Sequence, residues 1–263
     1  MSDSPALLRE DRASVRILTF NRPETRNTWS SALEAAIVAE FNAAEEDSDV
    51  RVIVITGSGD KAFSAGADLK DPSTHVTHSV ESFLAEHRAA TDPVWLRPVI
   101  NFSKPLIGAV NGYAVGAGCA LAMACDILIA SSNADFRFPQ SSLGIMPIYG
   151  GAARLAQWIG RGLAMEILLT GRALSAHEAS LHGLVNRVVE PGAVVEAAVE
   201  LAEAIAQQPM LASQMTKESL KSGLETEALR STSVADMYRY LALTQTKESL
   251  ERHDAWRAAR KAE

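Results

Sequence analysis

The sequence predicts an α/β fold in which a core of repeated ββα units precedes a helical appendage. Short runs rich in β-branched residues recur through the first half of the chain, whereas the pattern after Ser141 is mostly helical. With 263 residues, 47% of them hydrophobic, the chain is long and apolar enough for one sizeable core. We therefore expect a ββα core over residues 1–190 and a C-terminal helical region over residues 191–263.

Strand signals follow one another from the N-terminus. Val50–Gly57 is apolar and β-branched along most of its length, which is typical of a strand buried on both faces. Residues 6–10 are expected to pair with the strand that follows them across a polar turn at Asp11–Arg12. The expected strands are 6–10, Ser14–Phe20, Val50–Gly57, Ser103–Val110, Asp126–Ser131, Ala134–Phe138 and Leu184–Val189.

Helix signals separate some of these strands and dominate the C-terminal part. A helix is expected after "NRPETRNTWS", with Ser30 or Ser31 as its cap, because apolar residues then recur at helical spacing. Its expected apolar face comprises Leu33, Ile37, Val38 and Phe41. Beyond Pro191 the chain is expected to form successive helices, with Pro209 and Gly223 as interruptions.

Composition and charge exclude several classes of protein. The formal net charge of -7 offers no basic face for nucleic acid. No run of about eighteen apolar residues is present for a membrane span, and the charged opening residues contain no signal-peptide core, so we expect a cytoplasmic protein. Cys119 and Cys125 are expected to be small, reduced core residues, because no histidine follows them at metal-ligand spacing. No metal is expected.

Two segments rich in glycine and alanine are the strongest candidates for chemistry. "FSAGADL" (Phe63–Leu69) and "YAVGAGCAL" (Tyr113–Leu121) each follow a predicted buried strand and are interpreted as strand-to-helix turns. Small side chains leave backbone N–H groups uncovered there, and two such groups converging on one point stabilise an oxygen that gains negative charge. Close packing through small residues is the alternative interpretation. A dinucleotide site is excluded, because the third glycine of its fingerprint is replaced by Leu121.

The chain resembles the crotonase, or enoyl-CoA hydratase/isomerase, superfamily over essentially its whole length. The resemblance rests on "NRPETRN", "AFSAGADL", "KPLIGAVNGYAVGAGCALAMACDILIAS", "LGIMPIYGGAARL" and "LTGRALSAHEASLHGLVNRVV", in that order. It implies a crotonase-like spiral of ββα units with a C-terminal helical trimerisation region, and a homotrimer or a dimer of trimers. It also implies an acyl-CoA thioester as the substrate, so that coenzyme A belongs to the substrate and no separate cofactor is expected.

The resemblance assigns roles to individual residues. The backbone N–H groups of Ala67 and Ala117 are implied to form the oxyanion hole around the thioester oxygen. The residues implied to contact CoA are Arg26, Ala65, Gly66, Asp68 and Gly116. A helix N-cap is an equally good interpretation of Asp68, and Asp126 is expected to cap or pair within the core. An ion pair of Arg257 or Lys261 with CoA in a neighbouring subunit stays a further hypothesis.

Two positions depart from the pattern of the hydratases in this family. The glutamates that activate water there are replaced by Ala120 and Gln140, neither of which transfers a proton at neutral pH. Weak or no hydration of crotonyl-CoA is therefore expected. Gln140 remains able to orient a water or an acyl group, and Tyr149 either moves a proton or packs against the acyl chain. Glu81, Glu86 and His87 are further candidates for acid–base chemistry, and the alternative is that they form a solvated helix face. Asp135 and Arg137 are expected to form a structural ion pair.

These observations favour an enzyme that stabilises a thioester enolate, a lyase or isomerase of fatty-acid type metabolism. Decarboxylation of a malonyl-type thioester suits the missing glutamates best, because it needs no enzyme base. Two alternatives stay open: a non-catalytic acyl-CoA-binding protein, and a hydratase that uses a displaced acid or base. Residues Trp95, Ile145, Met146 and Ile148 belong either to an apolar acyl pocket or to the core.

Overall fold

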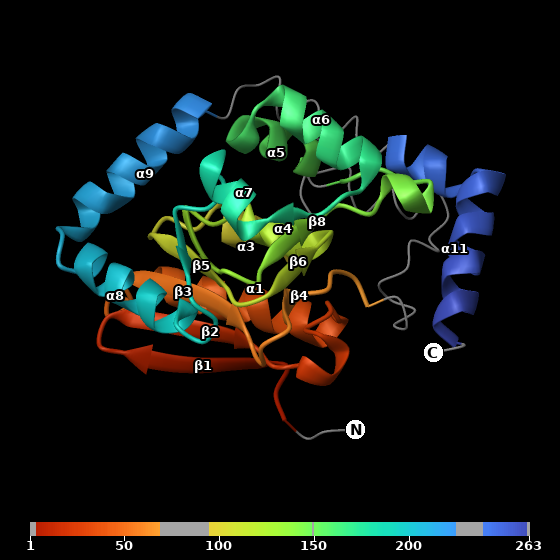
Figure 1. The fold of residues 1–263 in the computed structure, drawn as a ribbon. Helices are drawn as coiled ribbons and strands as arrows, with labels where there is room; N and C mark the ends of the chain where they lie inside the picture. The colour runs from red at the N-terminus through yellow and green to blue at the C-terminus, as the bar shows by residue number, and fades with distance from the viewer. Residues whose placement is uncertain (1–3, 69–94, 149, 225–238, 262–263) are drawn as a thin grey trace.

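The computed structural model describes residues 4–68, 95–148, 150–224 and 239–261 (Figure 1). It contains a six-stranded sheet in the order β1-β2-β3-β5-β7-β10 and a four-stranded sheet in the order β4-β6-β8-β9. The large sheet consists of β1 (Leu7–Arg12), β2 (Val15–Phe20), β3 (Val52–Gly57), β5 (Leu106–Val110), β7 (Ile127–Ser131) and β10 (Arg187–Val189). The small sheet consists of β4 (Ala62–Ser64), β6 (Tyr113–Val115), β8 (Asp135–Arg137) and β9 (Leu174–Ser175).

From β3 to β8, consecutive strands alternate between the two sheets, which confirms the expected ββα core. β3, β5 and β7 are parallel neighbours in the large sheet, and each is followed by a strand of the small sheet. After β5 and β6 the helix α4 (Ala117–Ala122) completes one such unit. The two segments expected to be strand-to-helix turns begin with the short strands β4 and β6, which were not predicted, and the second segment enters α4 at Ala117 as expected. Strands of three residues are too short to show period-two alternation, so their pairing partners determine them.

The N-terminal hairpin differs from the prediction in its turn. β1 pairs with β2 in antiparallel register, with Arg12 opposite Val15, so the turn lies at Ala13–Ser14 and not at Asp11–Arg12. Ala13 has a φ of 49°, a left-handed conformation that tight turns require. Asp11 instead belongs to β1 and faces Arg16 across the hairpin, which gives its carboxylate a partner.

Alternate residues of the large sheet divide the core into two parts. One face, with Ile17, Val54 and Ile107, is covered by α8 (Val194–Ala206). The other face, with residues such as Phe20 and Ile55, packs against α1 (Ser31–Glu46) and α4. The side chain of Ser30 accepts a hydrogen bond from Leu33 N–H at 3.3 Å, so Ser30 is the cap of α1.

Helices form most of the described chain after β8, as predicted. Their bounds are α5 Gly151–Ile159, α6 Arg161–Thr170, α7 Ala176–Leu181, α8 Val194–Ala206, α9 Met210–Leu224 and α11 Lys247–Lys261; shorter turns are α3 Arg97–Ile100, η1 Pro23–Thr25 and η3 Ser141–Leu143. Figure 1 shows α9 and α11 at opposite sides of the two sheets. None of the helices within the described ranges has the length and apolar character needed to cross a bilayer.

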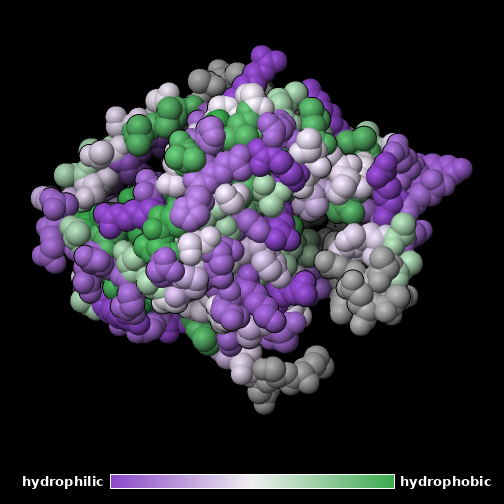
Figure 2. All heavy atoms as spheres, in the orientation of Figure 1, coloured by the Kyte–Doolittle hydropathy of each residue, from purple (hydrophilic) through white to green (hydrophobic). Residues whose placement is uncertain are grey.

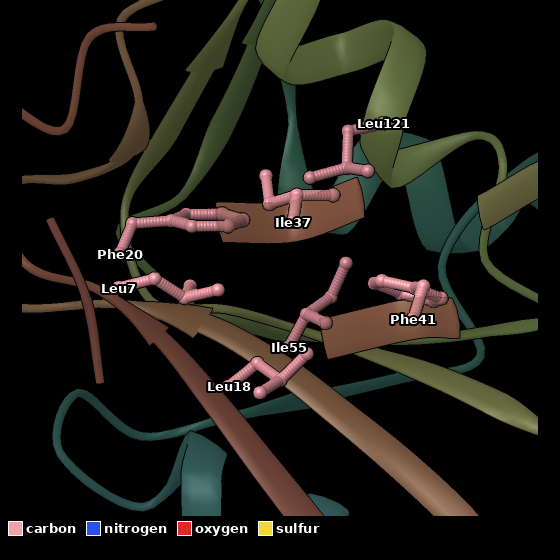
Figure 3. Close-up of a pocket in the computed structure, with 7 residues that line it drawn as sticks. All are labelled: Leu7, Leu18, Phe20, Ile37, Phe41, Ile55 and Leu121. Carbon is pink, nitrogen blue, oxygen red and sulfur yellow. The ribbon is translucent and has the colours of Figure 1, made fainter. Parts of the chain in front are cut away.

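An apolar pocket lies between α1, α4 and the large sheet (Figure 3). Its lining consists of Leu7, Leu18, Phe20, Ile37, Phe41, Ile55 and Leu121. It has no room for a water molecule, and all seven side chains are buried members of the core. This pocket is therefore a packing gap and not a substrate site.

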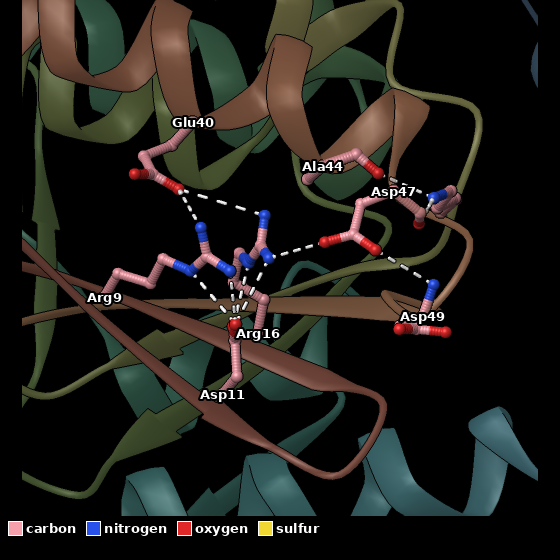
Figure 4. A network of polar contacts seen from close by, with 8 residues as sticks. Arg9, Asp11, Arg16, Glu40, Ala44, Asp47 and Asp49 are labelled. Atoms are coloured by element: carbon pink, nitrogen blue, oxygen red, sulfur yellow. Dashed lines mark hydrogen bonds and ion pairs between the residues drawn. The ribbon is translucent and has the colours of Figure 1, made fainter.

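A buried arginine is held by carboxylates at the edge of the large sheet (Figure 4). Arg16 is 1% exposed, and its guanidinium contacts Asp11 at 2.8 Å and Asp47 at 2.9 Å. Hydrogen bonds from Arg16, followed by those from Arg9, lower the pKa of Asp11 to about 2 from an ordinary value of 3.8. The network joins the N-terminal hairpin to the end of α1.

Acid is expected to weaken the protein through this network. A carboxylate whose pKa is depressed by folding stabilises the folded state above pH 3.8, and this contribution disappears as the pH falls toward about 2. In urea titrations, Asp11→Asn is expected to lower the unfolding midpoint at pH 6, with the difference from the wild type shrinking below pH 4. Asp60→Asn, at an exposed position without an ion pair among the described residues, serves as the control. An Asp11→Asn difference that is independent of pH would contradict the prediction.

Candidate functional site

The segment Ala65–Asp68 continues from β4 and lies between Trp29 and β6. Trp29 N–H donates to Gly66 O at 2.8 Å, and Asp68 N–H donates to Trp29 O at 3.0 Å. Trp29 and Ala67 thus form a parallel bridge. In such a bridge the N–H and C=O groups of the middle residue point away from the partner. The N–H of Ala67 therefore faces away from Trp29, toward the side of the segment where β4 pairs with β6.

The second segment enters α4 through a sharp turn at Gly116. This glycine has a φ of 54°, and its N–H donates to Arg137 O at 3.0 Å. The hydrogen bonds of the helix begin with Ala120 N–H donating to Gly116 O at 3.0 Å. Ala117 is the first helical residue, and its N–H has no acceptor within the part of the chain that the structure describes. The same holds for Ala67 N–H in the described ranges.

Close approach of the two segments explains their glycines. A β-carbon placed on Gly66 would lie 2.6 Å from Val115 O and 3.6 Å from Ala117 N. A β-carbon on Gly118 would lie 2.6 Å from Ser64 O. Only glycine allows both contacts, so the segment that carries the Ala67 N–H lies directly beside the segment that carries the Ala117 N–H. Two neighbouring backbone donors without acceptors are able to bind one oxygen that gains negative charge.

The residues expected to contact CoA lie beside the first segment. Arg26 is exposed and has a φ of 62°. Its carbonyl accepts a hydrogen bond from Ala65 N–H at 2.9 Å. Gly66 and Asp68 follow in the same segment, and Gly116 belongs to the second one. The structure thus brings all five expected residues to the same region.

Asp68 is held by two residues that sequence reasoning missed. Its carboxylate accepts hydrogen bonds from Arg22 at 2.9 Å and from Thr28 at 3.2 Å. Arg22 also donates to Thr28 O at 2.8 Å. The N-cap interpretation of Asp68 involves residues 69–94, which lie outside the described ranges. The only sequence signal for Arg22 is its place in "NRPETRN", since the 46 positions that separate it from Asp68 carry no periodicity.

Gln140 lies at the second segment, at the start of η3. Its Nε2 atom is 3.4 Å from the position of a β-carbon placed on Gly116. Its Oε1 atom is buried and accepts no hydrogen bond within the described structure. Ala120, at the other position where the family's hydratases have glutamate, is 6% exposed in α4. Neither side chain transfers a proton at neutral pH, so both are limited to packing or orienting roles.

The other residues singled out from the sequence either make structural contacts or lie outside the described ranges. Arg137 forms the expected pair with Asp135, with both contacts at 2.6 Å. Asp126 accepts a hydrogen bond from Leu106 N–H at 2.8 Å and pairs with Lys217 at 2.7 Å. Burial raises the pKa of Asp126 although Lys217 opposes the shift. Residues outside the described ranges are Tyr149, Glu81, Glu86 and His87, and nothing is described of the Lys261 side chain.

Core packing accounts for the thiols and for Trp95. Cys119 and Cys125 are free and buried, as expected, and burial raises the pKa of both thiols. Trp95 stacks on Trp29 at 4.3 Å between ring centroids, which favours its assignment to the core. Among the described residues, no cluster of three or more His, Cys, Asp or Glu side chains is placed to bind a metal ion.

Comparisons with known proteins find the same family, and the matches cover 80% or more of this chain. A family profile described as enoyl-CoA hydratase/isomerase matches residues 10–262. A probable enoyl-CoA hydratase of Rhizobium meliloti (strain 1021) is 38% identical over 260 residues, covering 98% of this chain and 96% of the relative. A 2,3-dehydroadipyl-CoA hydratase of Escherichia coli (strain K12) is 42% identical over 212 residues, covering 80% of each chain. The solved carnitinyl-CoA hydratase of Mycobacterium avium has a TM-score of 0.84 and 32% identity, covering 97% of both chains.

Proposed function

Because the chain belongs to the crotonase, or enoyl-CoA hydratase/isomerase, family of enzymes, we propose that it binds an acyl-CoA thioester and stabilises the enolate of that thioester. The α/β architecture is the crotonase fold. The observation that carries the proposal is the pair of N–H groups of Ala67 and Ala117, which have no acceptor among the described residues and belong to two segments in direct contact. Coenzyme A enters as part of the substrate, and the proposal requires no separate cofactor.

The two N–H groups polarise the thioester carbonyl in this mechanism. Negative charge moves onto the carbonyl oxygen as the neighbouring carbon becomes electron-rich, and hydrogen bonds to that oxygen strengthen in the transition state. Loss of CO₂ from a malonyl-type thioester fits this arrangement. The bond between the α-carbon and the carboxylate breaks, its electron pair forms the enolate, and water or a phenol then supplies a proton to the carbon. Ala120 and Gln140 support this choice, because hydration needs a proton transfer that neither provides.

A panel of thioesters tests the reaction type. Malonyl-CoA, methylmalonyl-CoA, 3-enoyl-CoA thioesters and crotonyl-CoA are incubated with the purified protein, and products are identified by mass spectrometry. We expect turnover of a malonyl-type or isomerisable thioester, with crotonyl-CoA hydrated at least about 10²-fold more slowly than by a hydratase that has both glutamates. Fast hydration of crotonyl-CoA would contradict the proposed reaction. Tight binding without turnover of any thioester would favour a non-catalytic acyl-CoA-binding protein.

Hydration is the second candidate function, because the relatives named above are described as hydratases. It requires a carboxylate from elsewhere in the chain to activate water. Crotonyl-CoA hydration that persists in Gln140→Ala would support this alternative. Loss of hydration in that variant would instead show that Gln140 orients the attacking water.

We also propose that the chain forms a homotrimer or a dimer of trimers through its C-terminal helices. Large apolar side chains of α9 are exposed, with Leu211 at 66% and Leu220 at 65%, and Figure 2 shows hydrophobic residues spread over α9, α5 and α6 on this face of the molecule. Lys217 fixes α9 to the core through Asp126 at 2.7 Å and Lys104 O at 2.8 Å.

Lys217→Met is therefore expected to weaken self-association by releasing α9 from the core. Sedimentation velocity over a range of protein concentrations measures the shift toward monomer. Lys247→Met, which removes an exposed pair with Glu251 within α11 at 3.6 Å, serves as the control. A wild-type protein that sediments only as a monomer would rule out the proposed assembly.

A further inference from the structure

We propose that Arg22 is a positioning residue that sets the direction of the Ala67 N–H through its ion pair with Asp68. This inference rests on the proposed function, because it assumes that the Ala67 N–H binds the thioester oxygen. Arg22 has no proposed contact with the substrate. It acts on the segment that carries the donor.

The contacts of Arg22 join two segments that are distant in the sequence. One guanidinium nitrogen donates to Thr28 O at 2.8 Å and lies 3.3 Å from Thr28 Oγ1. The other donates to Asp68 Oδ2 at 2.9 Å. Thr28 Oγ1 donates to the same carboxylate oxygen at 3.2 Å. Backbone N–H of Arg22 is itself fixed by Asn27 Oδ1 at 3.0 Å. Arg22 therefore fastens Asp68 to the residue that precedes Trp29.

Ala67 precedes Asp68 directly and lies in the segment that the ion pair of Arg22 with Asp68 restrains. On one side, the Gly66 carbonyl, which shares a peptide group with the Ala67 N–H, accepts a hydrogen bond from Trp29 N–H at 2.8 Å. On the other side, Asp68 is 8% exposed, and the ion pair restrains its side chain in addition to the hydrogen bond that its N–H donates to Trp29. The Trp29 backbone therefore holds the segment on both sides of Ala67, and Arg22 ties Asp68 to Thr28, the residue before Trp29. The direction of the Ala67 N–H then depends on where Asp68 is held.

Removal of Arg22 takes away the guanidinium that donates a hydrogen bond to the buried Asp68 carboxylate. A carboxylate in that situation gains hydration by moving outward. Movement of Asp68 rotates the peptide that bears the Ala67 N–H, whereas the Ala117 N–H stays in place on α4. A misdirected donor loses most of its effect on the transition state, because hydrogen bonds weaken steeply with angle.

The experiment compares Arg22→Met with Arg22→Lys and Asp68→Asn by two readouts. The first is the absorption band of bound 4-dimethylaminocinnamoyl-CoA, a conjugated thioester whose band moves to longer wavelength as its carbonyl is polarised. The second is kcat and KM for the thioester that the wild type turns over in the panel. Arg12→Met, which removes the ion pairs of Arg12 with Glu10 at 2.7 Å and with Glu196 of α8 at 2.8 Å, is the matched control. Thermal unfolding checks that each variant is folded.

We expect the wild type and Arg12→Met to give the same red shift, and Arg22→Met to lose most of it while still binding the probe. Its kcat is expected to fall by about 10- to 100-fold with little change in KM, as for a weakened oxyanion donor. Arg22→Lys is expected to restore part of the shift. The double variant Arg22→Met/Asp68→Asn is expected to be no worse than Arg22→Met, because the two side chains act as a pair.

The two proposals fail in different ways. A wild-type protein that binds the probe without any red shift would overturn the proposed oxyanion hole. A normal wild-type shift that persists unchanged in a folded Arg22→Met variant would overturn the positioning role alone. Equal losses in Arg22→Met and Arg12→Met would also overturn it, since a general effect on stability would then explain both.

Discussion

Replacing Ala117 with proline is expected to lower kcat by about 10²- to 10³-fold while the protein still folds. Ala117 is the first residue of α4, and proline is well tolerated at the first position of a helix because the N–H there is not part of the helical ladder. The substitution removes one of the two proposed donors and places ring carbons where the thioester oxygen would lie. The loss corresponds to about 3–4 kcal/mol of transition-state stabilisation.

A second helix of the same chain provides the control for this variant. Arg161 is the first residue of α6, follows a glycine as Ala117 does, and is exposed. Arg161→Pro is expected to leave both turnover and the red shift of bound 4-dimethylaminocinnamoyl-CoA unchanged. If Ala117→Pro binds that probe with an unchanged red shift, the N–H of Ala117 is not a donor to the thioester.

Replacing Gly66 with alanine is expected to reduce both stability and turnover. The φ of 82° lies in the left-handed region, which costs an alanine about 1–2 kcal/mol. The added β-carbon would lie 2.6 Å from Val115 O, so the two segments must separate. Such overpacking typically costs a further ~1–3 kcal/mol. Separation of the segments moves the two proposed donors apart, and turnover is expected to fall by at least about 10²-fold.

Urea unfolding and steady-state kinetics measure the two effects on the same samples. Gly162→Ala is the matched control, because nothing lies within 4 Å of a β-carbon placed on Gly162 in α6. Alanine there is expected to raise stability by about 0.5–1 kcal/mol and to leave turnover unchanged. A Gly66→Ala protein that is as stable and as active as the wild type would show that the two segments need not touch.

Local sequence pattern was enough to predict the elements whose formation depends on neighbouring residues. Continuous apolar, β-branched runs predicted β3, β5 and β7, because strands buried on both faces need no polar alternation. Helical spacing and a capping serine predicted α1, with Ser30 as its cap. The order of the family's motifs predicted the ββα core and pointed to Ala67 and Ala117 as the proposed donors.

Features that depend on contacts between distant parts of the chain became visible only in the folded structure. β4 and β6 form because each pairs with another strand. Three residues contain too little pattern to predict that pairing. The contact between Gly66 and the start of α4, and the ion pair of Arg22 with Asp68, join residues about 50 positions apart. Local propensity contains no information on such contacts, since their geometry is set by how the sheets pack. For the same reason, the direction in which a backbone N–H points could not be predicted from the sequence.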